Sequence, residues 1–491
     1  MSRRKYLAVG AGVVGAAVVG GAAYYLSTRG PTTPSTGKPL EGETVKILSF
    51  AAPYTNWVKN LGPKFKEEYG AELVAVECPD EELYRKAVTE FIAGTGAYDV
   101  VVCHYSDVGE FVVNGWIECI EDLYNTYGLD PHNEDMSDVL RLCGCGWGGK
   151  VWGQLQDGDI HIFYYRKDLF NHPDERDEFK SQYGFELRPP QTWEEHNKIA
   201  EFFTRKKGEK LAGQTLEKDF YGTAFWGKRG FAFGWFVGRW AGFELPYFDE
   251  EMNPMIDSEE GIKAMENLVE AVKYCPPGVL NYQYADIRAA LANGDIAMCE
   301  QWTCVGKGPE FHTPDMIPKI GYSILPGWMV NGQLKRRAPL LVGHLLVVPK
   351  DSKHKKAATY AAWWFTKPGD IDFEITSEQK YTTLCDPWRK STLDSSEFAA
   401  LWPTAAEYLA AIKASFESAY PELRIPGGHR YLYDEVDQAV VDACSGVKDP
   451  EKAIKDCAKA WDQITDEYGR EKQKQYWKQE LENWKRAGIY K

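Results

Sequence analysis

The stretch 155–170, LQDGDIHIFYYRKDLF, contains a polar turn, an apolar strand and the start of a helix in immediate succession. Asp157 and Asp159 flank a glycine in the turn, residues 160–165 have the pattern of a strand, and Asp168 opens a helical turn. The two acids have three interpretations: catalytic carboxylates, ligand-binding carboxylates, or residues that stabilise an ordinary turn. The stretch places them where the chain enters an α/β unit.

Strands and helices alternate on both sides of this stretch. Strand patterns cover 44–50, 71–78, 98–103, 295–302 and 340–350, and helical patterns cover 57–69, 81–93, 193–206, 259–274, 287–294 and 354–367. Thr192 and Ser258 precede two of these helices as N-caps. The alternation predicts an α/β fold with a largely parallel sheet, in which ligands bind beyond the carboxyl ends of strands. Residues 50–57 and 104–107 occupy such positions.

Length and composition limit the class of protein. At 491 residues the chain is expected to form two or three structural units. Its net charge of −15 repels the phosphates of nucleic acid, so we expect no nucleic-acid partner. The aromatic share of 14%, with 17 Trp, exceeds what a core needs and is typical of a protein that binds a carbohydrate or another flat apolar surface.

The first 29 residues have the layout of an export signal. Arg3, Arg4 and Lys5 precede an uncharged run, 6–28, in a pattern that resembles the twin-arginine signal. The run is long enough to span a bilayer, which takes about 20 residues. Residues 30–42 follow as a flexible Pro/Thr/Gly linker. We expect a cell-surface domain tethered to the membrane by an uncleaved segment, or a secreted protein if the segment is cleaved.

Eleven cysteines in an exported chain leave two readings open, disulfides or buried free thiols. Cys444 and Cys457 are a plausible bridge between two successive helices. The spacing of the cysteines lacks the paired C-x-x-C pattern of structural zinc. His104, His161 and His344 could line one site because each lies in or after a strand, but their spacing does not support a metal triad, and we predict no metal and no cofactor.

Few residues in the chain lie in a pattern that is typical of a catalytic site. The sequence lacks G-x-S-x-G, H-E-x-x-H, P-loop and G-x-G-x-x-G motifs. Glycosidase carboxylates flank the scissile bond and usually come from separate elements, whereas Asp157 and Asp159 share one turn. We therefore predict no catalytic residues and no enzyme activity, with an exported carbohydrate-active enzyme as the alternative.

Aromatic residues are concentrated between positions 225 and 240, where rings, glycines and basic residues interleave. Glycines allow rings to approach a ligand closely, and Arg or Lys donates hydrogen bonds to hydroxyl groups. Trp226, Arg229 and Trp235 are candidates for sugar binding in this stretch. Trp302, at the end of the strand DIAMCEQW, offers a second stacking surface.

Several stretches in the same order resemble the extracellular solute-binding proteins of ATP-driven sugar importers, the maltose-binding-protein-like family. They are ETVKILSF, ELYRKAVTEFIAGTGAYDVVVC, DGDIHIFYYRKDLF, AALANGDIAMCEQW, IGYSILPG, LLVGHLLVVPKDSKHKKAATYAAWWFT and YTTLCDPWRKS. The resemblance implies a periplasmic-binding-protein-like fold of two α/β lobes, joined by a hinge that the chain crosses several times, with the ligand cleft between them. Lobe 1 is expected to comprise 43–157 and about 342–385, lobe 2 to comprise 158–341 and about 386–470, and 471–491 to form a charged, solvated helix.

The resemblance also implies a function and a set of ligand-binding residues. The protein would capture a sugar or oligosaccharide by closure of its lobes and deliver it to the permease subunits of an ABC importer; a non-sugar solute is an alternative. Besides the tryptophans and Arg229 above, the implied ligand-binding residues are Tyr54, Trp57, His104, Tyr105, Asp107, Asp157, Asp159, His344, Asp386 and Arg389. His344 departs from the small residue common in the family and could narrow the pocket.

Overall fold

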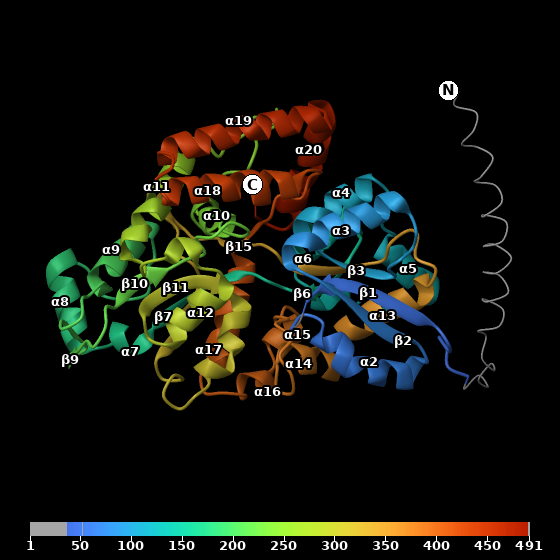
Figure 1. Ribbon diagram of the computed structural model, residues 1–491, viewed down its shortest axis with the longest axis horizontal. Helices are drawn as coiled ribbons and strands as arrows, with labels where there is room; N and C mark the ends of the chain where they lie inside the picture. The colour runs from blue at the N-terminus through green and yellow to red at the C-terminus, as the bar shows by residue number, and fades with distance from the viewer. Residues whose placement is uncertain (1–36, 52, 490–491) are drawn as a thin grey trace, which may run out of the picture.

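The two lobes expected from the sequence are present in the structure, a computed structural model that describes residues 37–51 and 53–489 (Figure 1). Each lobe is built around one sheet. The first has the strand order β2-β1-β3-β16-β6 and the second β10-β11-β7-β12. Their strands are β1 (Thr44–Phe50), β2 (Glu72–Cys78), β3 (Val100–His104), β6 (Gln154–Asp157), β16 (His344–Val347), β7 (His161–Arg166), β10 (Tyr221–Ala224), β11 (Ile296–Trp302) and β12 (Ile320–Ser323).

Helices cover both sheets, which explains why strands such as β3 and β11 are buried along their whole length. Around the first sheet lie α2 (Asn56–Tyr69), α3 (Asp80–Ala93), α4 (Val108–Val113), α5 (Ile120–Tyr127), α6 (Asp138–Cys143), α13 (Lys355–Thr366) and α14 (Asp370–Thr376). Around the second lie α7 (Lys167–Phe170), α8 (Pro173–Tyr183), α9 (Trp193–Phe203), α10 (Phe233–Ala241), α11 (Glu259–Ala271), α12 (Tyr284–Ala292), α17 (Ala405–Glu417), α18 (Asp437–Cys444) and α19 (Pro450–Tyr468).

Shorter elements connect these layers. They are the strand pairs β4 (Gly146–Trp147) with β5 (Lys150–Val151), β8 (Lys210–Leu211) with β9 (Gln214–Thr215), β13 (Trp328–Val330) with β14 (Gln333–Lys335) and β15 (Ala338–Leu340) with β17 (Ala419–Pro421); the helices α15 (Lys390–Leu393) and α16 (Ser396–Ala399); the 3-10 turns η1 (Tyr105–Asp107), η2 (Asn133–Asp135), η3 (Val272–Tyr274), η4 (Val279–Asn281), η5 (Thr303–Lys307) and η6 (Pro309–Phe311); and the π-helix η7 (Arg430–Val436).

One strand in each sheet runs against the others, so the sheets are mixed where a largely parallel sheet was expected. β16 is antiparallel to β3 and β6, and β7 is antiparallel to β11 and β12. The physical reason is connectivity: β7 follows the chain's passage from the first sheet, and β16 follows its return. β16 therefore starts at the edge of the first sheet where β1, β3 and β6 end, and β7 starts at the edge of the second sheet where β11 ends. These strand ends of the two sheets come together.

The local elements agree well with the sequence patterns. β1 covers 44–50 as predicted, and α2, α3, α9, α11 and α13 lie within a few residues of the expected helices. The side chains of Thr192 and Ser258 cap α9 and α11 as predicted, accepting the backbone N–H of Glu195 at 3.1 Å and of Gly261 at 3.3 Å.

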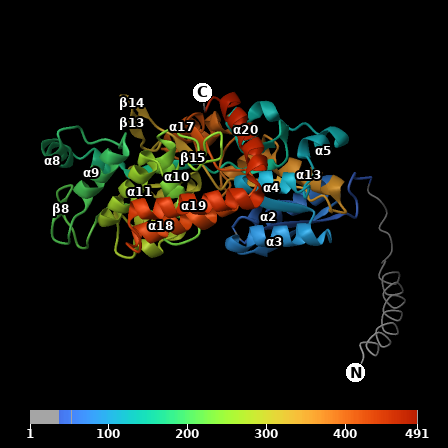
Figure 2. The ribbon, with the colours of Figure 1, turned by 90° about the horizontal axis from the view of Figure 1, so that it is seen from above.

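The C-terminal helix α20 (Arg470–Arg486) corrects the expectation of a solvated surface helix. Trp477, Glu480 and Trp484 lie on one face of it and are at most 1% exposed. The helix packs on α6 and α19, and Figure 2 shows α20 beside the end of α19. Glu480 pairs with the fully buried Arg424 at 2.8 Å. Its high charge predicted a solvent-facing helix, and the charged residues of one face are exposed, but the residues of the opposite face repeat at helical spacing and are buried.

The cysteines decide between the two readings that the sequence left open. All eleven are free and buried in the structure, so the bridge between Cys444 and Cys457 is not formed, although the two helices that carry them are present. The thiols serve as small apolar side chains with weak donors. Cys275, for example, lies within hydrogen-bond distance, 3.2 Å, of the Ala271 carbonyl oxygen.

The expected signal segment and most of the expected linker lie outside the described residues. The linker's last residues, 37–42, are packed against the first lobe, since Leu40 is 2% exposed and its N–H donates to the Tyr69 carbonyl oxygen at 3.0 Å. Among the residues that the structure describes, no helix has the length and apolar character needed to cross a membrane.

Candidate functional site

The strand ends that face the other lobe carry the candidate site. β1 ends at Phe50, β3 at His104 and β6 at Asp157, while β16 begins at His344. The sheet register sets His344 opposite both His104 and Asp157. Four residues that are far apart in the sequence therefore lie side by side because of strand pairing alone.

Aromatic rings of the first lobe surround His344. Its ring centroid lies 4.6 Å from that of Phe50, 4.9 Å from that of Tyr54 and 5.6 Å from that of His104. The side chain is 2% exposed, and burial together with the neighbouring His104 lowers its pKa well below the ordinary value. His344 is consequently a neutral imidazole at physiological pH.

The second lobe contributes a cluster of tryptophans around Trp302. This ring, at the end of β11, lies 4.8 Å from the ring of His161, 5.5 Å from Trp235 and 5.9 Å from Trp226. Within the described part of the chain, the indole N–H groups of all three tryptophans are buried without a hydrogen-bond partner. Such groups are costly to leave unpaired in a core, and they are suitable donors for a polar ligand.

A stack of rings joins the two lobes. His429, just before η7, lies face to face with Tyr84 of α3 at 4.3 Å and with Tyr433 at 4.4 Å, both at an interplanar angle of 7°. Tyr433 in turn stacks on His104 of β3 at 5.7 Å. Phe231 completes the contact between the clusters, 6.0 Å from Trp302 and 5.7 Å from Tyr433. The rings of His429 and Tyr433 from the second lobe thus lie between those of Tyr84 and His104 from the first lobe. This is the arrangement of closed lobes.

The D-G-D turn places two buried acids beside this cluster. Asp157 is fully buried and Asp159 is 4% exposed. Gly158 between them lies against Trp388, since a Cβ at this position would come within 2.3 Å of the Cβ of Trp388. The glycine is therefore required by a close approach of the hinge segment, and it fixes the direction of both acids.

Asp386 and Lys307 complete the acidic cluster. The backbone N–H of Asp386 donates to Asp157 Oδ1 at 2.8 Å, and its side chain accepts from the Thr303 hydroxyl and pairs with Lys307 at 3.2 Å. Burial raises the pKa of all three carboxyls, and the charge of Asp386 raises that of Asp157 further. More carboxylates than cations share this low-dielectric site, so it favours protons or an added cation.

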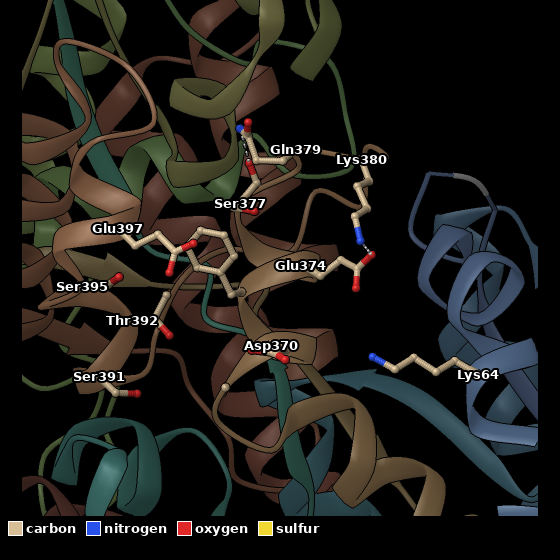
Figure 3. Close-up of a pocket in the computed structure, with 12 residues that line it drawn as sticks. Lys64, Asp370, Glu374, Ser377, Gln379, Lys380, Ser391, Thr392, Ser395 and Glu397 are labelled. Carbon is tan, nitrogen blue, oxygen red and sulfur yellow. Dashed lines mark hydrogen bonds and ion pairs between the residues drawn. The ribbon is translucent and has the colours of Figure 1, made fainter. Parts of the chain in front are cut away.

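Two of the surface cavities are relevant to the location of the site. One, of about 340 Å³, opens beside the ring stack between α3 and η7 and is lined by Tyr84, His104, Arg229, Phe231, His429 and Tyr433 among others. The other, of about 490 Å³, lies between α2 and the helices α14 to α16; Figure 3 shows its charged rim, with Lys380 paired to Glu374. None of the residues predicted to bind ligand lines this second cavity, whereas His104, Asp107 and Arg229 line the first.

The structure brings together most of the residues singled out from the sequence. Those at the interface of the lobes are Tyr54, His104, Asp157, Asp159, Trp226, Trp235, Trp302, His344 and Asp386. Tyr105 and Asp107 lie directly behind: the Tyr105 hydroxyl donates to the Asp157 carbonyl oxygen at 3.4 Å, and Asp107 accepts the His104 N–H at 2.9 Å. Arg229 is on the rim, where it donates to the Gln438 side chain at 2.6 Å.

Two of the predicted residues lie elsewhere. Trp57 packs inside the first lobe, 4.1 Å from the Phe365 ring, because the first turn of α2 faces α13. Arg389 is buried beneath the hinge segment, where its guanidinium lies 4.2 Å over Trp388 and 3.5 Å from Asp135. Both have structural surroundings, and neither contacts the ring clusters described above.

Phe50, Phe231, His429 and Tyr433 belong to the candidate site but were not named as ligand-binding residues from the sequence. Phe231 lies inside the Gly-rich aromatic stretch, so the pattern held a signal for it. Phe50 is the last residue of a predicted strand, and the carboxyl end of a strand is a position where α/β proteins bind ligands. His429 and Tyr433 lie at and just after the start of η7, more than 180 residues from that stretch, and only the fold brings them to it.

The two lobes and the ring-lined, acid-containing interface between them are the defining features of the fold. Solved structures share this architecture. A solute-binding protein of an ABC transporter from Agrobacterium radiobacter in complex with ribitol aligns with a TM-score of 0.69 at 21% identity, covering 87% of this chain and 100% of that one. A protein from Agrobacterium vitis with bound D-mannitol gives 0.69 at 20% identity, covering 87% and 99%, and maltose-bound MalE3 of T. maritima gives 0.67 at 19%, covering 86% and 99%.

Residues 49–370 match the family of bacterial extracellular solute-binding proteins, and the chain belongs to this family. Among its relatives, the mannitol-binding protein of Pseudomonas aeruginosa is 23% identical over 386 residues, which is 76% of this chain and 81% of the relative. A probable amino-acid ABC transporter periplasmic-binding protein of Sinorhizobium fredii is 23% identical over 432 residues, 85% and 88% of the two chains.

Proposed function

We propose that the protein captures a sugar or a sugar alcohol outside the cytoplasm and delivers it to the permease subunits of an ABC importer. The observation that carries the proposal is the interface between the lobes, where buried indole rings, unpaired indole N–H groups and buried carboxylates meet. A polyhydroxylated solute presents apolar C–H faces to rings and hydroxyl groups to carboxylates, and so uses both kinds of contact. The relatives bound to ribitol, mannitol and maltose support the same class of solute.

Closure of the lobes is the proposed binding mechanism. Trp302 and Trp226 come from the second lobe, and Tyr54 and His344 from the first, so a solute between them contacts both lobes only in the closed form. Solute shifts the equilibrium by its preference for that form; going from mostly open to mostly closed takes about 5 kcal/mol. A few charge-assisted hydrogen bonds at about 1.5–3 kcal/mol each, with one stacked ring, are sufficient.

The lobe boundaries and the location follow from this proposal. We take 43–157 with about 342–385 as the first lobe and 158–341 with about 386–470 as the second, and the N-terminal segment as a signal or membrane tether. The closed, loaded protein would dock on a permease, and the solute would leave the cleft unchanged because the protein's role is binding without turnover.

Thermal-shift measurements against defined solutes test the proposal. The panel comprises ribitol, D-mannitol, D-tagatose, maltose and maltotetraose, with glutamate and lysine to represent the amino-acid class suggested by one relative. At a hundredfold excess over Kd a solute stabilises the folded protein by about 2.7 kcal/mol, which raises Tm by a few degrees. Stabilisation by amino acids and by none of the polyols or sugars would refute the proposed solute class.

Turnover measurements separate binding from catalysis. Purified protein incubated with maltotetraose should return the oligosaccharide intact, as judged by chromatography. Release of shorter sugars that disappears in Asp159→Asn would instead establish a carbohydrate-active enzyme.

A further inference from the structure

Three atoms suited to metal binding converge at the base of the cleft. Asp157, Asp159 and His344 each contribute one such atom, and the three atoms lie within 4.8 Å of one another. Asp157 Oδ2, Asp159 Oδ1 and His344 Nδ1 are buried and have no hydrogen-bond partner among the described residues. His344 Nδ1 lies 3.6 Å from Asp157 Oδ2. Unpaired acceptors this close together are unfavourable unless a further group lies between them.

The surroundings hold these atoms in place. The Asp386 N–H occupies Asp157 Oδ1 at 2.8 Å, which leaves Oδ2 to face His344. A register irregularity in the pairing of β16 with β6 falls directly after His344, and Phe50 and Tyr54 pack on its ring. Bulges of this kind redirect side chains at functional sites, and groups behind the ligands that fix their orientation are typical of metal sites.

The one cation of the acidic cluster is already used by other acceptors. Lys307 Nζ donates to the Cys385 carbonyl oxygen and pairs with Asp386 at 3.2 Å and with Glu378 at 3.5 Å. These three partners are other than Asp157 and Asp159, so the Lys307 ammonium group is directed away from the free oxygens of these two acids. A further cation would balance the charge of Asp157 and Asp159 at the cleft.

We propose that Asp157, Asp159 and His344 bind one divalent transition-metal ion, of which Zn²⁺ is the test case. Metal bonds of about 2.0–2.2 Å to oxygen and imidazole nitrogen put neighbouring ligand atoms about 3.0–3.5 Å apart, close to the separation of His344 and Asp157. Three protein ligands leave positions open on the ion. We further infer that two adjacent hydroxyls of the sugar or polyol occupy these positions, an inference that rests on the proposed function.

Calorimetric titration of EDTA-treated protein with ZnCl₂, without any sugar, tests the metal site. We expect one ion per chain, and a loss of affinity of roughly a hundredfold in His344→Ala and in the isosteric Asp159→Asn. The matched control is His132→Asn, because Asp130, His132 and Glu134 form a second, exposed group of potential ligands. Binding that survives in both cleft variants, or that disappears in His132→Asn, would overturn the proposal.

Cobalt spectroscopy distinguishes the proposed ligands from a neighbouring set, Asp159, Cys304 and Asp386. Co²⁺ held by two carboxylates and an imidazole should show only weak visible bands, and an intense thiolate charge-transfer band in the near ultraviolet would assign the ion to Cys304 and refute our ligands. D-Mannitol titrations of zinc-loaded and EDTA-treated protein test the hydroxyl inference, which predicts at least tenfold tighter binding to the loaded form. Equal affinity in both forms would refute that inference and leave the sugar function intact, whereas zinc binding without affinity for any sugar would refute the sugar function and leave the metal site.

Discussion

Removing His429 should shift the protein toward its open form, because this residue makes two contacts that exist only when the lobes are closed. Its ring stacks on Tyr84 at 4.3 Å, and Nδ1 lies 3.8 Å from Asp107. Burial opposes the charged form of His429, but the interaction with the nearby Asp107 carboxylate outweighs it and raises the pKa. Both partners belong to the first lobe, whereas His429 precedes η7, which packs on α18 and α19 of the second.

The magnitude of the effect follows from these contacts. A stacked pair contributes about 0.5–1.5 kcal/mol and a partly exposed ion pair about 0.5–1 kcal/mol. His429→Ala should therefore destabilise the closed form by about 1–2.5 kcal/mol, a factor of roughly 5 to 70 in the open–closed equilibrium. If the solute-free protein is mostly open, the apparent Kd for solute rises by the same factor.

Small-angle scattering of solute-free protein and calorimetry with the solute identified by thermal shift provide the two readouts. The matched control is His132→Asn, a histidine of similar exposure whose neighbours, Asp130 and Glu134, lie on its own lobe. The control should leave both readouts unchanged. A folded His429→Ala protein with wild-type affinity and an unchanged radius of gyration would show that the ring stack does not hold the lobes together.

Three further predictions concern binding and stability. Trp302→Phe should keep the fold and weaken sugar binding roughly tenfold in calorimetry, through loss of ring area and of the indole N–H; unchanged affinity would remove Trp302 from the site. Glu480→Ala should lower the free energy of unfolding by about 3–5 kcal/mol in denaturant titrations, because the buried Arg424 loses its partner; a loss below about 1 kcal/mol would contradict this. Burial raises the pKa of Glu422 from its usual 4.5 to about 7, so between these values the folded state retains a proton that the unfolded state has lost. Stability should then fall by about 3 kcal/mol as pH rises from 4.5 to 7, and Glu422→Gln should flatten that part of the profile; parallel profiles would exclude Glu422 as the cause.

Local patterns in the sequence predicted the secondary structure and part of the site. The alternation of apolar strands with amphipathic helices depends on neighbours a few residues apart, and so do the caps Thr192 and Ser258. Asp157 and Trp302 were identifiable because each lies at a strand end, and Asp159 because it lies in the turn that follows Asp157. The same reasoning failed for Trp57, since position after a strand does not determine which way the first turn of the next helix faces.

Long-range packing decided what local patterns could not. Both interpretations of the cysteines were compatible with their spacing, and only the structure shows that all eleven are free and buried. Likewise the charge of α20 is a property of its composition, whereas its burial depends on the partner surface that α6 and α19 supply.

The sequence by itself therefore determined the α/β class of the chain and the presence of acids and rings near strand ends, because hydrophobic periodicity and turn residues act over short distances. Only the tertiary structure decided that His344 faces Asp157, and that His429 and Tyr433 lie between Tyr84 and His104. The first follows from the register of β16 between β3 and β6, and the second from closure of two lobes. No local sequence pattern predicts either contact, since the residues that meet are separated by up to several hundred positions.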